Sequence, residues 1–163
     1  MSDKEKHIFT LKQLVNDEVN HIDRIVCYLD ELRNTSSCVL KGIYSTVYEF
    51  YIKDQLDNAE VLFKALCIYD IENADFVKGY AIVNHLKKNY QRAYDLYRVS
   101  LIFDKEDDYR TFFFMAQCQL SLNNREMGLS CLKIIINKSN SKVIRELATH
   151  YITLLERSPP SLK

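Results

Sequence analysis

Small residues recur at a fixed spacing along this chain, and this recurrence restricts the fold more than any other feature of the sequence. Ala59, Ala93 and Gly128 lie 34 and 35 residues apart. Two further series run in step with this one: one set lies twelve positions before each member, and a set of large residues lies four positions after it. In chain order these sets are Val47, Ala81 and Ala116, then Phe63, Tyr97 and Leu132. A period of about 34 residues indicates an array of stacked structural units.

The positions of the small residues indicate that each unit is a pair of helices. Helices that cross closely need small side chains at the crossing, and a large residue one turn later fills the space beside it. The pattern predicts an all-α tetratricopeptide-repeat superhelix of three helix pairs with flanking N- and C-terminal helices. We place the repeats at residues 40–73, 74–107 and 108–142, with internal turns at 53–55, 87–89 and 123–124. The predicted organisation is an N-terminal amphipathic helical region (1–38), the repeats (39–142), and a C-terminal capping helix and tail (143–163).

Composition agrees with a helical binding protein and disfavours several classes of function. The chain has 163 residues with only 3 Gly and 2 Pro, which suits helices in a single domain. Lys+Arg and Asp+Glu are both 22, so the charge balance does not indicate nucleic-acid or anionic-membrane binding. The N-terminus lacks the apolar core of a signal peptide, and no run approaches the roughly 18 apolar residues of a membrane span. We therefore expect a soluble protein of the cytoplasm, without stable membrane insertion.

The sequence lacks the usual patterns of catalytic and metal sites. Its five cysteines form no Cys-x-x-Cys pair, and its four histidines are scattered without His-x-x-x-His spacing. Three glycines could hardly form a phosphate-binding loop. We expect a non-enzymatic protein with no catalytic residue, no metal site and no cofactor. A Cys–His pair formed across the fold is left open at this point.

One apolar helical stripe lies in the N-terminal region, outside the repeats. Its residues recur at steps of three and four, and they include Val19, Ile22, Ile25, Val26 and Leu29. Two compatible interpretations are open. The stripe could cap the end of the array, as a repeat protein requires, or these five residues could form a homodimer interface, because the stripe is wide for a helix with one neighbour.

Stacked repeats of this kind have a concave face, which the first helix of each repeat supplies. Counted from residues 40, 74 and 109, the fifth, ninth and twelfth positions of these helices are predicted to point into the groove. They are Tyr44, Tyr48 and Tyr51 in the first repeat, Lys78, Ile82 and His85 in the second, and Phe113, Gln117 and Leu120 in the third. Tyr and Phe form shallow pockets for separate side chains at a modest ordering cost, so we expect a peptide-binding groove. The alternative is that Tyr44 and Tyr48 pack on the N-terminal helix.

Several segments of the repeats resemble a known family. They are residues 43–51, 57–63, 66–70, 90–97 and 117–120, and they include the runs Leu-Cys-Ile-Tyr-Asp and Gln-Cys-Gln-Leu. Together they are similar to the class II chaperones of bacterial type III secretion, which are the small tetratricopeptide chaperones of the translocator proteins. The resemblance covers roughly residues 40–140, whereas the first 38 residues depart from the family's pattern.

The resemblance implies a concrete function. Family members hold two hydrophobic translocator proteins in the bacterial cytoplasm before secretion and keep them soluble and apart. Each partner offers an extended segment of the form Pro/Val-x-Leu-x-x-Pro, which loses little entropy on binding and places alternate side chains in separate pockets. Carried over by position, the lining residues would be Tyr44, Tyr48 and Tyr51 for the first pockets, followed by Ile82, His85 and Phe113. Some members also bind a transcription activator, and the family's dimer contact lies in the N-terminal region.

A structural tetratricopeptide adaptor, built into a larger assembly, is the alternative function. Such an adaptor would use both the N-terminal stripe and the groove for stable subunit contacts. It would be soluble and stable only within its assembly, and it would not bind short peptides that contain proline. A chaperone, in contrast, would be soluble alone as a small oligomer.

Overall fold

Seven helices make up most of the described part of the computed structural model, and the first six form three pairs that follow the sequence repeat. The structure describes residues 6, 9–10, 13, 22, 24–25, 27, 37–70, 72–104 and 109–157. The helices are α3 (Ser37–Ile52), α4 (Leu56–Tyr69), α5 (Ala74–Leu86), α6 (Tyr90–Phe103), α7 (Tyr109–Ser121), α8 (Arg125–Lys138) and α9 (Lys142–Arg157). Within these ranges there is no strand, so the all-α prediction is confirmed.

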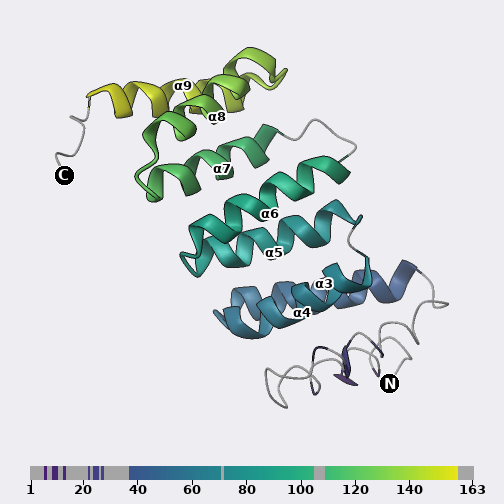
Figure 1. Cartoon of the computed structure of the whole chain (residues 1–163). Helices are drawn as coiled ribbons and strands as arrows, with labels where there is room; N and C mark the ends of the chain where they lie inside the picture. Colours follow the sequence, from purple (N-terminus) through teal and green to yellow (C-terminus); the bar gives the residue numbers. More distant parts are fainter. Residues whose placement is uncertain are drawn as a thin grey trace.

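Each helix packs against its neighbours in the chain, and the pairs α3/α4, α5/α6 and α7/α8 follow one another in a staggered stack (Figure 1). Buried side chains form two clusters, one centred on α3 to α5 and the other on α6 to α9. Leu96 of α6 packs against both clusters and connects them. This is the nearest-neighbour architecture of a repeat protein.

The small residues of the repeat lie where paired helices cross. Ala59 and Ala93 are completely buried, and Gly128 is buried as well. A Cβ atom on Gly128 would lie only 2.7 Å from Cγ of Leu120, so a side chain on α8 there would require Leu120 of α7 to shift. The tetratricopeptide prediction, which rested on these crossings, is confirmed.

The turn between the helices of each pair has the same backbone conformation in all three repeats. Asp54, Lys88 and Asn123 have positive φ angles of 55°, 63° and 60°. The residue after each one donates its backbone N–H to a carbonyl five residues earlier, as in the bond from Asn124 to Gln119 at 2.8 Å. A left-handed residue followed by such a bond satisfies the last carbonyls of a helix and ends it.

Described residues from outside the repeats pack at both ends of the stack. Ile25 is 0% exposed within the first cluster, and Ile22 packs against the same cluster. Burial of these two residues is what the capping interpretation of the N-terminal stripe requires, and capping stays a prediction. Val19, Val26 and Leu29 lie outside the described residues, so the homodimer interface stays a prediction. At the other end, α9 buries Ala148 and packs further apolar side chains on the second cluster. Over the described ranges, no helix has the length and apolar character needed to cross a bilayer.

Candidate functional site

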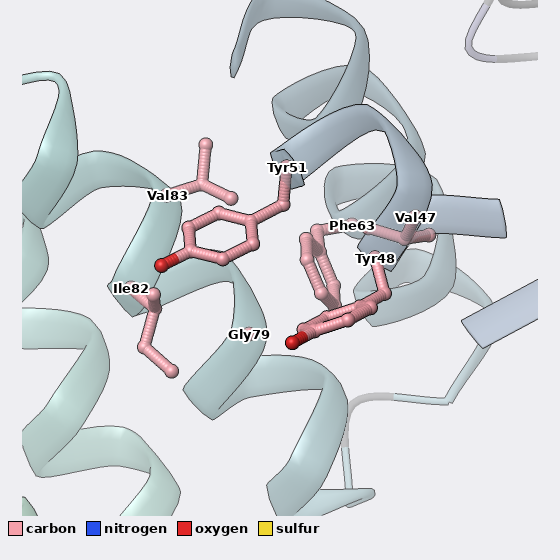
Figure 2. A pocket seen from close by; sticks show the side chains of 7 residues that line it. All are labelled: Val47, Tyr48, Tyr51, Phe63, Gly79, Ile82 and Val83. Carbon is pink, nitrogen blue, oxygen red and sulfur yellow. The ribbon is translucent and has the colours of Figure 1, made fainter. Parts of the chain in front are cut away.

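An apolar pocket of about 350 Å³ opens where the first repeat meets the second. It lies between α3, α4 and α5, and Figure 2 shows the side chains around it. Its lining residues are Val47, Tyr48, Tyr51, Phe63, Gly79, Ile82 and Val83. This volume lies at the lower end of the range for binding sites in proteins and suits one or two apolar side chains.

The floor of the pocket depends on a glycine inside a helix. A Cβ atom on Gly79 would lie 2.1 Å from Cε1 of Phe63, so the Phe63 ring of α4 lies directly on the backbone of α5. Val47, Phe63 and Val83 are nearly fully buried around this contact. Glycine weakens a helix interior by roughly 0.5–1 kcal/mol relative to alanine, so its presence here has a packing reason. The contact leaves an apolar hollow above the ring.

Two tyrosines of α3 form the rim on one side, and Ile82 of α5 faces them across the opening (Figure 2). The centroids of Tyr48 and Tyr51 are 5.8 Å apart with the rings tilted by 34°. These side chains are 58% and 39% exposed, and Ile82 is 37% exposed. Apolar surface left open at the mouth of an apolar hollow favours capture of another apolar side chain.

The structure therefore brings together three of the nine predicted groove residues, namely Tyr48, Tyr51 and Ile82. The third tyrosine among the candidates, Tyr44, lies on α3, but its side chain is outside the described part of the structure. The proposed role of Tyr44 in the groove remains a prediction.

The two remaining candidates of the second repeat have partners within the chain. Lys78 forms an ion pair with Asp104, with Nζ and Oδ2 2.5 Å apart, which ties α5 to the end of α6. His85 is half-buried among aromatic rings, with its ring edge-on to Tyr97 at 6.2 Å between centroids.

In the third repeat the predicted residues mainly contact neighbouring helices. The ring of Phe113 meets Tyr151 of α9 edge-on at 5.1 Å between centroids. Leu120 packs over Gly128 of α8, and Gln117 is half-buried. The placement of all three in a peptide groove remains a prediction.

A Cys–His pair does form across the fold, between the second and third repeats. Sγ of Cys118 lies 3.7 Å from Nδ1 of His85. Burial raises the pKa of the Cys118 thiol to about 12 and lowers the pKa of His85, so both groups are held neutral near pH 7. A nucleophilic cysteine needs the opposite, a thiolate stabilised by a nearby cation. In the described ranges, no three His, Cys, Asp or Glu side chains gather as metal ligands.

Four lining residues were not predicted from the sequence: Val47, Phe63, Gly79 and Val83. Val47 and Phe63 belong to the repeat series itself and are expected to be core residues. Gly79 offered a signal, because an isolated glycine within a helical pattern commonly has a packing or functional reason. Its contact with Phe63 joins residues of two repeats, however, and the repeat spacing does not contain that information.

Known proteins with similar sequences and structures agree with this architecture. The family model for the tetratricopeptide repeat matches residues 40–73 and 74–107. The chaperone protein SicA of Salmonella typhimurium is 36% identical over 128 residues, covering 78% of this chain and 77% of SicA. The low calcium response locus protein H of Yersinia pestis is 27% identical over 128 residues, covering 77% of this chain and 74% of that protein.

A solved structure extends the similarity to a complex. The type III secretion chaperone SycD of Yersinia enterocolitica, in complex with a peptide of the translocator YopD, has a TM-score of 0.65 to this chain. The two are 25% identical, and the match covers 76% of this chain and 95% of SycD. The extent of the SicA match, the shared repeats and this structural similarity lead to one conclusion. The chain belongs to the tetratricopeptide-repeat class II chaperones of type III secretion.

Proposed function

We propose that this chaperone binds hydrophobic translocator proteins of a type III secretion system through an extended segment that lies in its concave groove. The segment has the form Pro/Val-x-Leu-x-x-Pro, and one of its apolar side chains enters the pocket between α3 and α5. The protein acts in the bacterial cytoplasm, as a homodimer and without catalysis, and keeps its partners soluble before secretion.

The observation that carries the proposal is the open apolar pocket rimmed by Tyr48, Tyr51 and Ile82. Its floor is apolar, while the phenol groups at the rim supply hydrogen-bonding capacity beside it. That combination suits a peptide whose side chain is apolar and whose backbone needs partners. SycD, of the same fold, is known in complex with a translocator peptide.

Fluorescence anisotropy with a labelled Pro-x-Leu-x-x-Pro peptide tests the proposal. We expect saturable binding to the wild-type protein and at least tenfold weaker binding to Tyr48→Glu, because the substitution places an unpaired charge at the apolar rim. Ile102→Glu is the matched control, since Ile102 is 75% exposed on α6 and does not line the pocket. The control should bind like the wild type.

Circular dichroism on the same samples separates binding from folding. Tyr48→Glu should keep its helicity, because Tyr48 is largely exposed. Equal loss of binding in Tyr48→Glu and Ile102→Glu would contradict the pocket assignment. A wild-type protein that is folded but does not bind the peptide would contradict the chaperone mechanism.

Absence of peptide binding to the folded wild-type protein would favour the alternative, a structural adaptor in a larger assembly. One feature of the surface supports the alternative: Val143, Leu147 and Leu154 are exposed on α9 at spacings that place them on one helix face. An adaptor would need such a surface for stable contacts with other subunits.

A further inference from the structure

The pocket has a counterpart one repeat further along, because every residue that lines it has an equivalent in the next repeat. Residues of α3 and α4 correspond to those 34 positions later, and residues of α5 correspond to those 35 positions later. In the order used above for the pocket, the equivalents are Ala81, Ile82, His85, Tyr97, Phe114, Gln117 and Cys118. We call the site of the open pocket, between α3, α4 and α5, junction 1. Its counterpart between α5, α6 and α7 is junction 2.

The two junctions differ most at the residue that forms the floor of the pocket. Junction 1 has Gly79 at this position, and junction 2 has Phe114. The Phe114 ring stacks on Tyr97, the equivalent of Phe63, with centroids 5.8 Å apart and planes 18° from parallel. It also meets His85, the equivalent of Tyr51, edge-on at 6.3 Å. Phe114 thus lies against the counterparts of a floor residue and a rim residue of the open pocket.

Neighbours of Phe114 make further contacts within junction 2. His85 is edge-on to Tyr90 at 5.7 Å, and its Nδ1 atom lies 3.7 Å from Sγ of Cys118. Tyr97 is 1% exposed beneath this cluster, whereas Phe114 itself is 36% exposed toward solvent. A side chain entering junction 2 would have to displace the Phe114 ring from its stack, and the contact of that ring with the buried Tyr97 would be lost.

We propose that Phe114 determines specificity by occupying junction 2, so that the groove accepts a large apolar side chain at junction 1 only. This inference rests on the proposed function and specifies the partner's chemistry. The bound segment carries one large apolar anchor, and the residue that passes over Phe114 is small. The proposal thus assigns two different roles to equivalent positions: Gly79 opens a pocket and Phe114 fills one.

A scanned peptide series tests the assignment. The parent peptide keeps the anchoring Leu and has Ala at its flanking variable positions. In each derivative one of these positions becomes Leu, so that the series moves a second large side chain along the groove. For the wild-type protein we expect no derivative to bind more than about twofold tighter than the parent peptide. For Phe114→Ala we expect one derivative to bind about tenfold more tightly than the parent peptide, because the vacated junction then accepts its second Leu side chain.

Phe112→Ala serves as the control, since it removes the same ring from the same helix but packs against the second core cluster and stacks on Tyr109. It should show the wild-type profile. Phe114→Leu removes the stack and keeps an apolar side chain, so it should give a smaller gain in affinity for the same peptide derivative. It replaces Phe114→Ala in the experiment if that variant fails to fold.

The possible results separate this inference from the proposed function. A wild-type protein that binds the parent peptide and already prefers a second Leu by tenfold would overturn the role of Phe114 and leave the chaperone function standing. Identical profiles for the wild type and both Phe114 variants would overturn it too. Absence of saturable binding to every protein in the series would overturn both proposals.

Discussion

Asp54, Lys88 and Asn123 occupy the same position in the three repeats and share a backbone conformation that side chains rarely adopt. Asn and Asp tolerate the left-handed region better than other residues that have a Cβ atom, while glycine adopts it freely. Lys88, with φ of 63°, therefore carries more strain than its two equivalents. The turn geometry is a property of the repeat, and the residue that fills it varies.

Lys88→Gly is expected to stabilise the protein by about 1 kcal/mol, because glycine removes the steric cost of the left-handed conformation. A change of that size raises Tm by roughly 2–4 °C in a domain of 150–250 residues. Thermal denaturation followed by circular dichroism measures it. Asn123→Gly is the matched control at the equivalent position and should gain less. A larger gain at Asn123 than at Lys88 would contradict this explanation.

Gly79 shows why the site was harder to predict than the fold. The series of small residues marks crossings between the two helices of one repeat, so the repeat spacing alone revealed it. The contact of Gly79 with the Phe63 ring joins the first helix of one repeat to the second helix of the repeat before it. Only the packed structure shows that this contact lies beside an open hollow while the equivalent Phe114 stacks on Tyr97.

The helix pairs follow the sequence closely because their determinants are local. Small residues fix where α3 crosses α4 and where α7 crosses α8, and the turn residues fix where each first helix ends. Which side of a first helix faces the groove depends on contacts with helices further along the chain. Leu120 packs over Gly128 of α8, and the ring of Phe113 meets Tyr151 of α9, which packs on α7. These contacts come from helices that follow α7 in the chain.

Ala59→Leu is expected to destabilise the fold by roughly 1–3 kcal/mol, because the added atoms overpack the completely buried crossing of α3 and α4. Chemical denaturation measures the free energy of unfolding. Lys64→Leu is the control, since Lys64 is an exposed residue of the same helix and lysine and leucine have similar helix propensity. Equal stability of the two variants would show that α4 is turned differently from the arrangement described.

The helix pairs form a stack, and the stability of a stack follows from contacts between neighbouring units. Ile25 lies before the first repeat and is completely buried in the first cluster. Removing its side chain should therefore affect the units nearest to it most strongly.

Ile25→Ala is expected to cost about 2–5 kcal/mol, the range for truncating a buried isoleucine. Hydrogen exchange locates the effect: protection should fall first in α3 and α4, while α7 to α9 keep theirs. Truncation of Ile22, which is only partly buried, should give a smaller effect in the same helices. A uniform loss of protection from α3 to α9 would show that the stack unfolds as one cooperative unit and would contradict the nearest-neighbour description.

Direct observation of a partner side chain in the pocket would test the chaperone mechanism most stringently. The measurement is methyl NMR on isoleucine-labelled protein with an excess of the Pro-x-Leu-x-x-Pro peptide. Ile82 lies at the rim of the pocket, and Ile102 of α6 is exposed away from it. We predict intermolecular nuclear Overhauser effects between the peptide Leu and the δ1 methyl of Ile82, and none to Ile102. Saturable binding with Ile82 unperturbed, or with contacts to Ile102 instead, would contradict the assignment of this pocket as the binding site.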